Sequence, residues 1–119
     1  MKNVLTLAAV LEAATGLALL MAPALVARLL LGSEATGVAV PVARVLGIAL
    51  VALGVACWPD RTPLCGMLTY SAGVTLFLGY LGFAGRFTGV LLWPAVIAHL
   101  ILTALLAGVF IRKNKAGGN

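Results

Sequence analysis

The sequence predicts an all-α integral membrane protein, a bundle of four transmembrane helices with a short interfacial helix between the first and the second. Two observations support this class. Of the 119 residues, 63% are hydrophobic and only 9% are charged, and the mean hydropathy is +1.18, whereas a soluble domain is about half apolar and about a quarter charged. The apolar residues also gather into four stretches separated by glycine, proline and charged residues. This composition argues against a water-soluble monomer.

Each apolar stretch approaches the roughly 17 to 25 residues that a membrane-spanning helix needs. We expect spans at residues 4–21, 38–57, 64–83 and 90–111. The connections are short, so consecutive helices should pack as antiparallel hairpins. No internal repeat or second domain is evident, and residues 1–119 are therefore expected to form a single transmembrane domain that ends in a flexible tail, residues 112–119.

The segment after the first span departs from this pattern. Pro23 suits the first turn of a new helix, and the residues that follow are apolar apart from Arg28. We expect a short helix over residues 24–31 at the outer membrane interface, with Arg28 reaching toward the lipid headgroups. A simple continuation of the first helix is the alternative.

The basic residues predict the orientation. The net charge is +5, but the lysines and arginines are scattered among hydrophobic runs and make no stripe that could follow nucleic-acid phosphates. Because basic flanks are retained in the cytoplasm, we expect both termini on the cytoplasmic side of a bacterial inner membrane. With four spans, five basic residues share that side: Lys2, Arg61, Arg112, Lys113 and Lys115. Arg28 and Arg86 fall on the other side, and Arg44 is a third candidate for it.

Three ionisable residues lie inside the predicted spans: Glu12, Arg44 and His99. A charge at the centre of a bilayer costs roughly 2.5 to 3.5 kcal/mol on insertion scales, so such residues seldom face lipid. At about 1.5 Å per residue, they lie roughly 12, 21 and 17 Å above the cytoplasmic boundary. We expect them to meet in one polar core, with Tyr70, Thr75 and Thr103 nearby.

Two interpretations of this core stay open. In the first, Glu12 and Arg44 form an ion pair that fixes helix order and register. In the second, the carboxylate lines a site for a proton, an ion or a small solute, and desolvation and the neighbouring cation tune its protonation.

Metal and haem sites find no support in the sequence. His99 is the only histidine, which excludes a haem held by two histidines. With Glu12 it could supply at most two ligands in the core, too few for a catalytic zinc. We therefore expect neither a metal nor a cofactor, and a hydrogen-bonded core histidine.

Cys57 and Cys65 flank the loop between the second and third spans. The predicted side is cytoplasmic and reducing, so no structural disulfide is expected. A redox pair serving a quinone-linked oxidoreductase is one interpretation, and two ordinary small buried residues are the other.

Three stretches, "GLALLMAPALVARLLLG", "VARVLGIALVALGVACW" and "LLWPAVIAHLILTALL", resemble small bacterial four-helix membrane proteins of the broad DoxX-like kind. In that group a helix, a proline-led interfacial segment and an Arg-x-x-Gly span recur, and here Arg44 and Gly47 match the last pattern. The resemblance covers most of the chain and implies the fold more than the function. Some members are linked to thiol or quinone redox chemistry.

The chain also resembles small multidrug-resistance transporters, which are four-helix chains of this length with a membrane-embedded glutamate in the first helix. Glu12 fits that position. Thr15 stands where that group has a glycine, and Arg44 and the Pro23 segment depart from its pattern.

Together these observations predict a non-enzymatic protein that acts as an accessory subunit, or as a binder of a small molecule or lipid in a polar intramembrane core. One alternative is a proton-coupled transporter of small solutes that uses Glu12. Another is a quinone-linked or thiol-linked redox subunit of the membrane. We expect a homodimer, or a subunit of a larger membrane complex, in contact with the bilayer.

Overall fold

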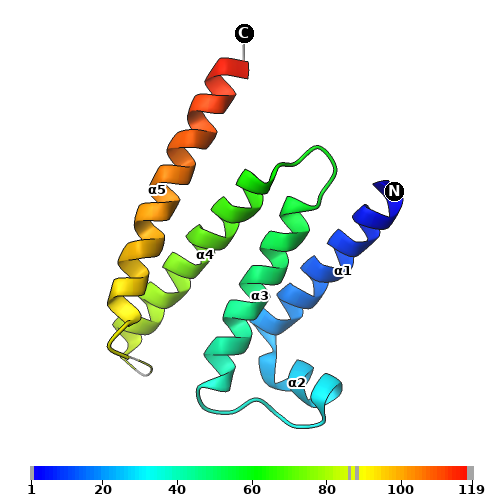
Figure 1. Ribbon diagram of the computed structural model, residues 1–119. Coiled ribbons are helices and arrows are strands. Elements are labelled where there is room, and N and C mark those ends of the chain that lie inside the picture. Colours follow the sequence, from blue (N-terminus) through cyan, green and yellow to red (C-terminus); the bar gives the residue numbers. More distant parts are fainter. Residues whose placement is uncertain (1, 86, 88, 118–119) are drawn as a thin grey trace.

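The computed structural model describes residues 2–85, 87 and 89–117, and the described chain is helical apart from its connections (Figure 1). The helices are α1 (Lys2–Met21), α2 (Pro23–Leu31), α3 (Ala39–Ala56), α4 (Pro63–Ala84) and α5 (Leu92–Gly117). Within the described ranges there is no strand. The predicted all-α class, with four long helices and one short one, is confirmed.

Four of these helices are long and apolar enough to cross a membrane: α1, α3, α4 and α5. Their bounds lie close to the predicted spans except at the C-terminus. There α5 continues past Ile111 as a helix through Gly117, so the last helix is longer than the predicted span, and the flexibility of the tail stays a prediction. Residues 118–119 and Arg86, which entered the orientation argument, lie outside the described residues.

Proline and glycine account for several helix ends. Ala22 has φ −142° and ψ 67°, which is not helical, and Pro23 then begins α2. Proline suits this position because it lacks the N–H that a first turn leaves unbonded. The alternative that residues 23–31 extend the first helix is therefore wrong. Gly32 and Gly85 end α2 and α4 at φ 83° and 76°, a left-handed conformation that glycine adopts without steric cost.

The short helix α2 runs across the end of the α1 and α3 pair (Figure 1). Its nine residues reach only about 14 Å, too short to cross a bilayer. Leu29, Leu30 and Leu31 are all more than two-thirds exposed. Arg28 pairs with Glu34 in the following loop, with 3.2 Å between Nη1 and Oε1.

The long helices stand in a row, in the order α1, α3, α4, α5. Among the described residues each packs only against its neighbours in this row, and no contact joins α1 to α4 or α5, or α3 to α5. The molecule measures 51 × 36 × 16 Å, so it is little thicker than one helix with its side chains, about 10 to 12 Å. The four-helix arrangement is therefore open, and α1 and α5 lie at opposite edges.

Small residues set the closest crossing, between α1 and α3. A Cβ atom added to Gly47 would lie 2.6 Å from the Gly16 carbonyl oxygen, and one added to Gly16 would lie 2.5 Å from the Gly47 carbonyl oxygen. Such backbone approach is how helices pack in membranes, where burial of apolar surface gives little driving force. Further along, Gly54 lies against Ala9 and Ala13. These contacts fix the antiparallel register of the pair.

Candidate functional site

The predicted site residues do not form one polar core. Glu12 lies half-buried near the middle of α1. No hydrogen bond or ion pair of its carboxylate occurs in the part of the chain that the structure describes. Because α1 does not touch α5, Glu12 and His99 cannot meet as expected.

Arg44 lies on α3, and it does not pair with Glu12. Among the described residues, Arg28 and Glu34 form the one ion pair within 4.0 Å. Gly54 faces Ala9 and Ala13 and so lies at the level of Glu12. Arg44 precedes Gly54 by ten positions, which is about 15 Å along a helix. The expectation that these side chains share one height is therefore wrong for this register. The Arg44 Nε is buried and has no acceptor among the residues that the structure describes.

The other predicted residues do come together, along the contact between α4 and α5. The rings of Tyr70 and His99 meet edge to face, with centroids 6.1 Å apart. The hydroxyl oxygens of Thr75 and Thr103 are 3.5 Å apart. All four side chains are half-buried, so this set forms a polar seam.

Most hydrogen bonds of the polar seam stay within its own helices. Thr75 donates to the Ser71 carbonyl and Thr103 to the His99 carbonyl, each over 2.7 Å. His99 Nδ1 lies 2.9 Å from the Ala95 carbonyl, and because a carbonyl can only accept, Nδ1 carries the hydrogen. The seam is consistent with a hydrogen-bonded packing contact.

Cys57 caps the end of α3 and Cys65 lies in the first turn of α4. Both are half-buried free thiols. The Thr62 hydroxyl donates a long hydrogen bond to Cys65 Sγ, over 3.8 Å. A redox role for the two cysteines stays a prediction. Among the described residues, no three His, Cys, Asp or Glu side chains gather closely enough to hold a metal ion.

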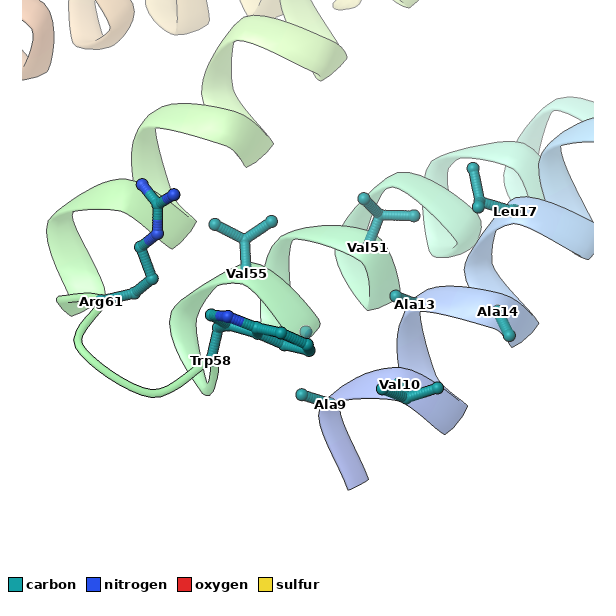
Figure 2. Close-up of a pocket in the computed structure, with 10 residues that line it drawn as sticks. Ala9, Val10, Ala13, Ala14, Leu17, Val51, Val55, Trp58 and Arg61 are labelled. Carbon is teal, nitrogen blue, oxygen red and sulfur yellow. The ribbon is translucent and has the colours of Figure 1, made fainter. Parts of the chain in front are cut away.

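A groove with a volume of about 680 Å³ lies between α1 and α3. Figure 2 shows its lining. One wall comes from α1, the other from α3 and the turn that follows it. The lining residues are Ala9, Val10, Ala13, Ala14, Leu17, Val51, Gly54, Val55, Trp58 and Arg61.

The groove has two chemically different parts. Along the helices it is apolar and walled largely by alanine, valine and glycine, because the close crossing of α1 and α3 requires small residues. At the end of α3, Trp58 turns its indole toward Ala9, while Arg61 extends toward the first turn of α4 (Figure 2). The Arg61 amide donates to the Trp58 carbonyl over 3.1 Å, which holds this turn.

Glu12 and Arg44 stand differently toward this groove. Glu12 is two residues from both Val10 and Ala14, which line it, so its carboxylate projects from roughly the opposite side of α1, since each residue turns a helix by about 100°. Arg44 is seven residues before Val51 and so shares its side of α3, about 10 Å further along. The two charges therefore lie on opposite faces of the row.

Sequence reasoning missed the groove. It used Arg61 only to predict the orientation in the membrane, whereas Arg61 and Trp58 both line one end of the groove. The small residues at positions 9, 13, 16, 47 and 54 recur at helical spacing and could have indicated a close crossing, but not the space beside it.

Comparison with models of protein families, with curated proteins and with solved structures finds no significant match. The resemblance to DoxX-like proteins and to small multidrug-resistance transporters therefore stays a prediction.

Proposed function

We propose that this chain is a membrane-embedded binder of an amphipathic molecule, a lipid or a lipid-like small molecule, which occupies the groove between α1 and α3. One observation carries the proposal: a groove of about 680 Å³ is apolar along its length and ends at an indole and a guanidinium. This differs from the polar core expected from the sequence, because the ligand would lie against alanine and valine and not between Glu12 and His99.

The size and chemistry of the groove suit such a ligand. Ligand pockets commonly enclose about 300 to 1,000 Å³ and combine mostly apolar walls with a few placed polar groups. An apolar tail along Val10, Leu17 and Val51 would gain dispersion contacts with the groove walls. Trp58 and Arg61 would face the polar end, where indole and guanidinium groups prefer the membrane interface.

The position of the polar end agrees with this assignment. The α3–α4 loop, which carries Arg61, lies at the same end of the molecule as the start of α1 and the end of α5 (Figure 1). That end also carries Lys113 and Lys115 on α5. If it is cytoplasmic, as the basic residues predict, the ligand enters from the inner leaflet.

The proposal can be tested with a substitution that fills the groove with a large side chain and leaves the crossing of α1 and α3 unchanged. Ala14 lines the groove and is exposed. Ala8 is also exposed on α1 but does not line the groove, and it projects from the opposite side of the helix, two residues before Val10 and nine before Leu17. We expect Ala14→Phe to reduce the lipid retained on the purified protein at least fivefold, as measured by native mass spectrometry. Ala8→Phe is the matched control and should retain lipid like the wild type. Equal retention by both variants would refute the proposal.

A second candidate, proton-coupled transport of a small solute, is favoured by Glu12. Its half-buried carboxylate has no hydrogen bond or ion pair among the described residues, and intramembrane carboxylates commonly mark proton pathways. This candidate predicts that an imposed solute gradient moves protons in proteoliposomes and that Glu12→Gln abolishes the movement. Glu34→Gln, which changes an exposed loop carboxylate, should leave it intact. Absence of any wild-type flux would remove this candidate.

A further inference from the structure

A second cavity lies between the first turn of α4 and the last turns of α5. It encloses about 490 Å³, and we call it the basic bay. Its lining comes from the α3–α4 loop, the start of α4 and the end of α5: Asp60, Arg61, Thr62, Leu64, Cys65, Phe110, Lys113 and Asn114.

The charges in the basic bay favour an anion. Arg61 and Lys113 supply two cations against the single carboxylate of Asp60. No ion pair within 4.0 Å joins Asp60 to either cation in the described chain. The bay also lies beside the N-terminal end of α4, a helix of 22 residues, and the partial positive charge of a helix N-terminus adds to the attraction. The Asn114 side-chain amide can donate hydrogen bonds, whereas the Thr62 hydroxyl already donates to Cys65 Sγ.

The apolar members of the lining indicate which anion. Leu64 and Phe110 stand beside the cations, and both belong to helices that can cross a membrane. A ligand with charge and apolar parts next to each other fits this combination better than a free ion does. Lysine and arginine at such a boundary attract anionic lipid, each by about fivefold in affinity near the surface.

We infer that the basic bay binds the phosphate of an anionic phospholipid, held between Arg61 and Lys113. This deepens the proposed function and rests on it, because Arg61 lines both the bay and the groove. The groove then selects a molecule with an apolar tail, and the bay selects among such molecules by the charge of the headgroup.

The experiment compares two lipids of equal chain length, phosphatidylglycerol and phosphatidylcholine, added to the delipidated protein and counted by native mass spectrometry. We expect the wild type to prefer phosphatidylglycerol and Lys113→Gln to reduce that preference about fivefold. Lys115→Gln removes the same charge from the same helix but does not line the bay, so it should change the preference less than twofold. Equal effects of the two variants, or no preference in the wild type, would overturn the inference.

Two further arms separate the sources of phosphate and the two sites. Glycerophosphoglycerol, the same phosphodiester headgroup without acyl chains, carries the same single negative charge without a tail, and millimolar amounts should not compete with phosphatidylglycerol. Effective competition would mean that the bay binds a free phosphate ester, and would overturn the assignment to lipid. Ala14→Phe should lower the binding of both lipids alike and leave the preference unchanged. If it does so while Lys113→Gln has no effect, the groove stands and the bay fails.

Discussion

Glu12 and Arg44 are the most costly residues of the chain in a membrane, and the structure keeps them apart. A half-buried Glu12 at mid-helix faces away from the groove, whereas Arg44 lies on the groove side of α3, about five residues from its start. That position is roughly 8 Å from the helix end, within the reach of a side chain that extends toward the interface. Glu12 and Arg44 therefore lie in separate environments, Glu12 near the middle of its helix and Arg44 near the end of its own.

Their separation predicts independent effects on stability. Residues more than about 7 to 10 Å apart with no shared partner usually have additive effects within about 0.5 kcal/mol. We expect the loss of stability in the Glu12→Gln, Arg44→Gln double variant to equal the sum of the single losses, as measured by unfolding in detergent. A coupling of about 2 kcal/mol or more would show that the two side chains meet, contrary to the register of α1 and α3.

The sequence predicts on which side of its helix each of these residues lies, but not which helix that side contacts. Helical periodicity places Arg44 with Val51 and sets Glu12 apart from Val10 and Ala14. Which helix each face meets depends on the order of helices in the row. The long helices are apolar on nearly every side. No polar face therefore distinguishes the side that packs against other helices from the side that faces lipid. The expected meeting of Glu12, Arg44 and His99 failed for this reason, whereas Tyr70, Thr75, His99 and Thr103, on consecutive helices, did come together.

At the scale of elements, the crossing of α1 and α3 depends on the absence of side chains at Gly16 and Gly47. Each glycine lies against the carbonyl oxygen of the other, and a backbone atom cannot move aside as a flexible side chain can. The same crossing places the small-residue walls of the groove, so the geometry of the groove and the stability of the pair have one cause.

Gly47→Ala should therefore destabilise the protein although alanine is the better helix former. The added Cβ would lie 2.6 Å from the Gly16 oxygen, and overpacking of this kind typically costs about 1 to 3 kcal/mol. Gly79→Ala is the matched control in a helix interior, because a Cβ there meets nothing within 4 Å, and it should be neutral or stabilising by up to about 1 kcal/mol. Equal thermal stability of the two variants would contradict the close crossing.

The whole molecule is a row one helix thick, and this shape leaves both faces of the row uncovered. In α5 only 6% of the membrane-crossing window is buried within the chain. Helix boundaries and spans follow from proline, glycine and hydropathy, and the sequence predicts them well. The open row does not follow from them, because short loops permit both a closed bundle and a row.

We expect the open row to associate in the membrane, most simply as a homodimer with two-fold symmetry. Association would cover one face of the row and could supply an acceptor for the unpaired Arg44 Nε. The measurement is the detergent-corrected mass from light scattering. A mass of 12.1 kDa, one chain, at every concentration would contradict the expectation.

The central claim is that an amphipathic molecule occupies the groove between α1 and α3. Its most direct test is photo-crosslinking in proteoliposomes with a phospholipid that carries a diazirine on its acyl chain, followed by peptide mapping. Bulk lipid should label in proportion to exposure, which favours Leu76 and Ile101, exposed by 75% and 54%. A bound lipid should instead label the half-buried Val51, with Val10 and Leu17, above that proportion. Labelling that follows exposure alone, with Val51 below Leu76 and Ile101, would contradict the claim.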